Sequence, residues 1–121
     1  MKNENFTETF QQLKKILTKY ESKLKLTVSD GNNYSLDAGY SEKYKRNVFF
    51  GAVNIKKNYV SFHLMPVYIF PELLKNISPE LKKRMQGKSC FNFKTIKASE
   101  IKELDNLTRL GFEAFKKDKL V

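Results

Sequence analysis

The sequence lacks tryptophan and contains a single cysteine, Cys90. One thiol cannot form an internal disulfide, so the cysteine content does not indicate an oxidising compartment. Residues 1–12 are polar and acidic where a signal peptide would need an apolar run, and the longest apolar stretch, residues 60–70, is interrupted and too short to span a bilayer. We therefore expect a cytoplasmic protein without a membrane partner.

Motifs of catalysis, metal binding and phosphate binding are also missing. Neither Ser61 nor Ser89 lies in a nucleophile elbow, and the chain has no CxxC pair and no glycine-rich phosphate loop. His63 is the only histidine, and with Cys90 it supplies two soft metal ligands where a structural zinc site uses four. The sequence therefore predicts no catalytic activity, no cofactor and no tight iron or zinc site.

Arginine is scarce in a chain that is otherwise strongly basic. Of 23 basic residues only three are arginine, and with 13 acidic residues the formal net charge is +10. Lysine lacks the forked guanidinium that reads base edges, and the lysines are spread along the whole chain. We interpret them mainly as solvated surface, so specific nucleic-acid recognition is not expected; weak, non-specific binding stays an alternative.

What the sequence does contain is enough apolar periodicity for one domain over residues 1–121. An apolar stripe with helical spacing begins at Phe6 and predicts a first helix over about residues 6–22. A second stripe begins at Ile101 and continues through Phe115, which predicts a long closing helix. Both stripes require a large apolar surface to cover.

Alternating patterns between these helices predict five strands, over residues 24–28, 34–38, 47–55, 59–65 and 89–93. Residues 39–46 are expected to form a loop or an edge, 71–76 one or two helical turns, and a helix is expected from Ser78 to a stop at Gly87. The three-residue link at 56–58 is too short for a crossover, so the strands must be antiparallel. We predict an α+β fold, with one antiparallel sheet of about five strands and the N- and C-terminal helices on one face.

Strand periodicity also predicts a candidate site. In residues 59–65, Val60, Phe62 and Leu64 point one way, and the alternate residues, from Tyr59 to Met65, point the other. If the helices cover the apolar face, the second face displays polar and aromatic groups suited to a ligand or a partner. The predicted ligand-binding residues are Asn54, Tyr59, Ser61, His63, Cys90 and Asn92, with the tyrosines of the first hairpin as further candidates.

These residues also have plainer explanations. A lone strand histidine is more often structural than catalytic, and Cys90 without a neighbouring base is typical of a small core residue.

Several short segments resemble the YdhG-like family of small bacterial proteins. They are FFGAV at 49–53, KNYVSF at 57–62 with Met65-Pro66, residues 81–85, and Gly87-Lys88 leading into FNF at 91–93. The resemblance covers the second half of the chain and the first half in outline. It implies an α+β fold with an antiparallel sheet and terminal helices, and, from some members, a frataxin-like iron-chaperone role.

The residues themselves favour a small non-enzymatic binding domain. The expected partner is a small ligand or a protein, a second copy of the chain included, bound at the second face of the sheet. Dispersed carboxylates do not form the acidic surface that iron handling would use, so the iron-chaperone role is the alternative that the resemblance adds.

Overall fold

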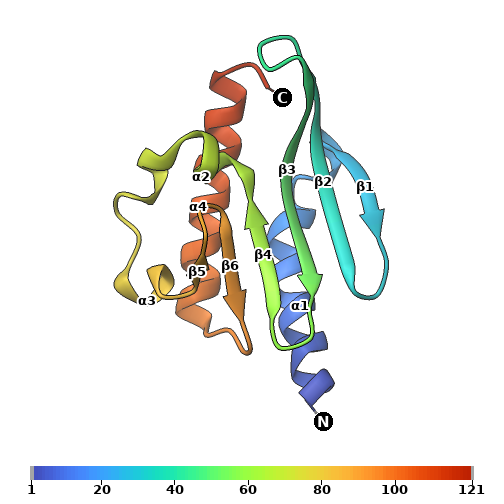
Figure 1. Cartoon of the computed structure of the whole chain (residues 1–121), viewed down its shortest axis with the longest axis vertical. Helices are drawn as coiled ribbons and strands as arrows, with labels where there is room; N and C mark the ends of the chain where they lie inside the picture. The colour runs from blue at the N-terminus through green and yellow to red at the C-terminus, as the bar shows by residue number, and fades with distance from the viewer. Residues whose placement is uncertain (1, 121) are drawn as a thin grey trace.

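The computed structural model describes residues 2–120, with side chains described from Phe6 onward. A single antiparallel sheet has the strand order β1-β2-β3-β4-β6-β5, and the long helices α1 and α4 lie behind it in Figure 1. The strands are β1 (Lys25–Ser29), β2 (Asn33–Ser41), β3 (Arg46–Ile55), β4 (Val60–Leu64), β5 (Met85–Gln86) and β6 (Cys90–Phe93). The helices are α1 (Lys2–Thr18), α2 (Met65–Ile69), α3 (Pro79–Lys82) and α4 (Ala98–Lys117), with 3₁₀ turns η1 (Glu21–Lys23) and η2 (Pro71–Leu74).

Both long helices bury their apolar stripes against the same face of the sheet, which confirms the predicted fold class. Phe10, Leu13 and Leu17 of α1 are fully buried, and Phe115 of α4 packs edge-on against Phe50 of β3 with ring centroids 5.4 Å apart. The strands number six where about five were expected. None of the described helices has the length and hydropathy needed to cross a bilayer.

The first half of the chain differs from the prediction in two places. The first helix covers Lys2–Thr18 instead of residues 6–22, and a 3₁₀ turn takes up Glu21–Lys23. Residues 39–46, expected as a loop or an edge, instead extend β2 to Ser41 and start β3 at Arg46. Gly39 permits this extension because its φ of +106° lets the irregular stretch of β2 pass without a steric penalty.

The region after β4 differs more. Met65, expected to end a strand, begins the short helix α2, with Pro66 in its first turn. The helix predicted from Ser78 has its expected cap, since the Ser78 Oγ accepts a hydrogen bond from the Leu81 backbone N at 3.1 Å. It ends at Lys82 instead of at Gly87, because residues 85–86 form β5 along the free edge of β6.

Candidate functional site

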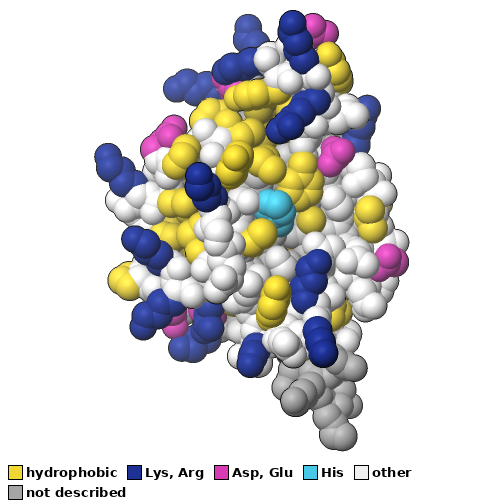
Figure 2. All heavy atoms as spheres, viewed as in Figure 1, with side chains coloured by type: hydrophobic (Ala, Val, Ile, Leu, Met, Phe, Trp, Pro, Cys, Tyr) yellow, Lys and Arg dark blue, Asp and Glu magenta, His cyan; other side chains and the backbone are white. Residues whose placement is uncertain are grey.

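The face of the sheet turned away from α1 and α4 carries the predicted site residues. Directly paired residues of antiparallel strands point to the same side of a sheet. Asn54 pairs with Ser61 and Ser61 with Asn92, while His63 pairs with Cys90 on the same side. We call this side the open face, because the two long helices lie behind the sheet in the view of Figure 1. Figure 2 shows it in the same view, with the single histidine near its centre.

The middle of the Asn54–Ser61–Asn92 row is occupied by internal contacts. The Asn54 side chain donates a hydrogen bond to the Asn33 Oδ1 at 2.7 Å, and Ser61 is buried. The Asn92 backbone N donates to the Arg84 carbonyl at 2.8 Å, and Asn92 is half-buried. Asn54 and Ser61 therefore stabilise the sheet, and Asn92 is the member of the row that lines a pocket.

His63 is held at the centre of the open face. Its Nε2 lies 2.6 Å from the Ser89 Oγ, and the ring of Phe49 packs edge-on against it at 4.9 Å between centroids. Partial burial lowers the pKa of His63 below its ordinary value, because it disfavours the charged imidazolium. Neither Ser89 nor Phe49 was among the residues predicted for the site.

Their positions depend on the register of the sheet. A bulge skips Phe50 between the pairs Leu36–Gly51 and Asp37–Phe49, and this turns Phe49 to the open face. Ser89 reaches His63 because its neighbour Cys90 pairs directly with His63. Phe49, His63 and Ser89 come together only through the pairing of three strands. The periodicity of a single strand does not contain this information.

The Ser89–His63 contact has part of the geometry of a nucleophile and its base. Hydrolytic catalysis would further need a group that orients the histidine and donors that stabilise an oxyanion. Within the described part of the chain no carboxylate bonds to His63, and Ser89 is buried. The Leu64 backbone N also donates to the Ser89 carbonyl at 2.9 Å, so the contact anchors the start of β6 to β4.

His63 and Cys90 lie directly opposite one another, on β4 and β6. Among the described side chains, those of residues 6–120, no group of three or more histidine, cysteine, aspartate or glutamate residues could hold a metal ion. Two protein ligands would leave most of a zinc or iron coordination shell to water.

A polar hollow lies where β5, β6 and the residue before β4 meet. It has a volume of about 440 Å³ and contains two of the predicted residues, Tyr59 and Asn92. Its charged side chains are all basic, and no carboxylate lines it among the described residues. We call it the basic pocket; its lining residues are Tyr59, Lys83, Arg84, Gln86, Asn92, Phe93, Lys94 and Thr95.

Arg84 is the fixed group of the basic pocket. Its Nε donates to the Oε2 of Glu100 at 2.9 Å, and Glu100 is only 1% exposed. The guanidinium carbon lies 5.8 Å from the centroid of the Phe93 ring, a cation–π contact. Glu100 balances the charge of Arg84, so the net positive charge of the pocket comes from Lys83 and Lys94.

Tyr34 of the first hairpin does not join the open face as expected. Tyr34 points to the core and is 1% exposed, and its hydroxyl donates to the Glu21 carboxylate at 2.6 Å. Burial, together with this bond, raises the pKa of Tyr34 well above its ordinary value.

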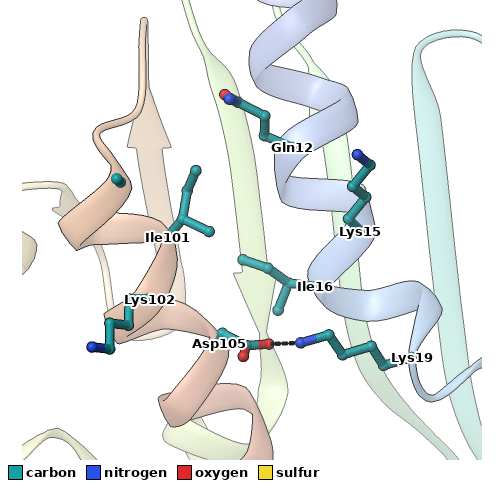
Figure 3. A pocket seen from close by; sticks show the side chains of 8 residues that line it. Gln12, Lys15, Ile16, Lys19, Ile101, Lys102 and Asp105 are labelled. Carbon is teal, nitrogen blue, oxygen red and sulfur yellow. Dashed lines mark hydrogen bonds and ion pairs between the residues drawn. The ribbon is translucent and has the colours of Figure 1, made fainter.

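Another hollow, of about 400 Å³, lies between α1 and α4 on the other side of the molecule. Figure 3 shows Ile16 and Ile101 pointing toward one another across it, and Lys102 pointing away. The Lys19 Nζ and Asp105 Oδ1 bridge the two helices at 2.7 Å. The Asp105 carboxylate of this hollow is therefore already paired with Lys19. Its apolar residues, Ile16 and Ile101, take part in the packing of α1 against α4.

Comparisons of the chain with protein-family models, with curated proteins and with solved structures found no match. The resemblance of the second half of the chain to the YdhG-like family stays a prediction.

Proposed function

We propose that this chain is a non-enzymatic binding domain, and that a small anionic ligand binds at the basic pocket. The observation that supports this most is the lining of the pocket: no lining carboxylate among the described residues balances Lys83 and Lys94, while Arg84 is paired with Glu100. A hollow of about 440 Å³ is within the size range of small-molecule sites.

The fixed guanidinium of Arg84 makes the pocket suitable for a phosphoryl or carboxylate group. Only its Nε is used by Glu100 in the described structure, so the outer nitrogens remain available as donors. An arginine that is already held in place loses little conformational entropy when it binds an anion. Lys83 and Lys94 add charge-assisted hydrogen bonds from flexible side chains.

The neutral members of the pocket extend the ligand class beyond a bare anion. The Tyr59 ring is partly exposed, at 36%, and can stack on a planar group. Asn92, Gln86 and Thr95 offer donors and acceptors for such a group. A phosphorylated compound with a planar ring, as in a nucleoside monophosphate, matches both features.

The test is a calorimetric titration with adenosine 5′-monophosphate and, separately, with inorganic phosphate. We expect the nucleotide to bind more tightly than phosphate, and Lys83→Gln or Lys94→Gln to weaken it about tenfold, the scale of one hydrogen bond to a charged group. Lys116→Gln, an exposed lysine of α4, is the control with the same change of charge. Equal weakening by Lys116→Gln would reject the site.

A second candidate, weak binding of single-stranded nucleic acid, is favoured by the net charge of +10. The same pocket would then hold one phosphate of a longer chain, and further lysines would contact its neighbours. Affinity for an oligonucleotide would fall steeply with salt, because several counterions are released, whereas a mononucleotide releases few. A salt slope near that of the mononucleotide would reject this second candidate.

A further inference from the structure

The open face carries a second hollow, with a different chemistry, at the end of the sheet where α2 begins. It has a volume of about 300 Å³ and is walled on one side by the β2–β3 hairpin and on the other by α2. We call it the α2 hollow; it is lined by Tyr44, Arg46, Asn47, Val48, Phe49, Met65, Tyr68 and Ile69. Figure 2 shows hydrophobic side chains gathered in the upper part of this face, above the histidine.

The walls of the α2 hollow are attached to the rest of the fold. In the hairpin wall, the Tyr44 backbone N donates to the Ser41 Oγ at 3.2 Å, and Lys43 forms an ion pair with Asp118 at 3.0 Å. In the other wall, Pro66 of α2 packs directly against Gly111 of α4. The hollow is therefore preformed, as small-molecule sites usually are.

Arg46 is the only charged side chain among the residues that line the α2 hollow. It is exposed, and within the described residues its guanidinium has no ion pair and no side-chain hydrogen bond. Six of the other lining residues are apolar or aromatic, and Asn47 is the remaining polar one. One unpaired guanidinium beside an apolar surface is complementary to a single carboxylate with an apolar body.

We infer that the α2 hollow binds a small apolar monocarboxylate, with Arg46 on the carboxylate and Phe49, Met65 and Tyr68 around the apolar body. This site is independent of the basic pocket, which has polar walls, several cations and none of these residues. A second copy of this chain is a poor occupant, because two surfaces of a protein with a net charge of +10 repel one another.

Methionine methyl groups give a direct readout. The chain contains three methionines, of which Met65 lines the hollow and Met85 lies on β5. With ¹³C-methyl-methionine protein we expect octanoate to shift the Met65 signal in a saturable way and to leave the Met85 signal in place. A Met65 signal that does not move up to millimolar octanoate would overturn the proposal.

The role of Arg46 is tested by changing ligand and protein in parallel. Arg46→Gln is expected to weaken octanoate about tenfold, the effect of one lost charge-assisted hydrogen-bond pair, without changing the weak binding of octan-1-ol. Arg109→Gln on α4 is the matched control and should leave octanoate affinity unchanged. Tyr68→Ala, at a residue 53% exposed and thus tolerant of substitution, should weaken both ligands.

Three further outcomes would also overturn the proposal. One is octan-1-ol binding as tightly as octanoate, and another is equal weakening by Arg46→Gln and Arg109→Gln. The third is a Met65 shift caused by a short peptide with an apolar C-terminal residue when octanoate causes none, since the occupant would then be a protein terminus.

Discussion

Gly111 allows a sharp test of how α4 supports the open face. Gly111 lies inside α4 and is buried, and a Cβ added there would lie 2.7 Å and 2.9 Å from two ring carbons of Pro66. Alanine is favoured over glycine in a helix by about 1 kcal/mol. Overpacking of a rigid core contact typically costs about 1–3 kcal/mol. Because Pro66 is buried and its ring cannot rotate away, we expect the steric cost to exceed the gain in helix propensity.

Gly111→Ala should therefore lower the free energy of unfolding by up to about 2 kcal/mol, the difference between these two terms. In a Pro66→Gly background, which lacks both the Cβ and the Cγ of Pro66, the steric cost disappears, and the same substitution should stabilise the protein by up to about 1 kcal/mol. The coupling between the two positions, measured by urea unfolding of the four proteins of the cycle, should be at least about 1 kcal/mol.

A matched helix control separates propensity from packing. Ala114→Gly, in the same helix, should cost about 1 kcal/mol, whether residue 66 is proline or glycine. Two results would show that α2 and α4 are not in close steric contact at this point. One is that Gly111→Ala stabilises the protein that retains Pro66. The other is that the changes in the free energy of unfolding at the two positions simply add.

Three further predictions concern the sheet and its open face. Phe62 is fully buried, so Phe62→Ala should lower the free energy of unfolding in urea by about 3–5 kcal/mol, and a loss below about 1 kcal/mol would mean that the strand faces are reversed. In a proton NMR titration, the resonance of the single histidine should report a pKa of His63 below 6.5. Because the unfolded chain then binds more protons than the folded one, the free energy of unfolding should fall as the pH is lowered from 6.5 toward the folded pKa. His63→Gln should remove that part of the pH dependence. A folded pKa above 6.5 would contradict the burial argument. Anaerobic calorimetry with ferrous iron, or with zinc, should detect no tight stoichiometric site, and micromolar binding that is lost in His63→Ala would restore the iron-chaperone alternative.

Much of the fold could be predicted because the apolar patterns are strong. The stripes that include Phe10 and Phe115 require a common apolar surface, and the alternation around Phe62 separates the two faces of β4. The short links along the chain from β1 to β4 leave no alternative to antiparallel pairing of these strands. The misplaced segments are those decided by tertiary contacts: β5 forms because the edge of β6 is available, and residues 85–86 have no strong local preference of their own.

The candidate site could be predicted only in part, for a related reason. Periodicity correctly groups Ser61 with His63 on one face, but it does not say which side chains are used internally. Asn54 is bonded to Asn33, and Ser61 is buried, so these residues mainly serve the sheet. Arg46, Lys83 and Lys94 join the open-face hollows through loops and strand ends, where the sequence carries no periodic signal.

The contacts of α4 have a consequence for how the protein is made. Glu100 holds Arg84, Glu103 binds Ser78 through two hydrogen bonds of 2.6 Å, and Gly111 receives Pro66. During translation, at about 5–20 residues per second, all these partners leave the ribosome before α4 does. The nascent chain can pair its strands early, yet it cannot organise either hollow until its last helix has emerged. Both hollows would thus be completed only at the end of the domain's synthesis.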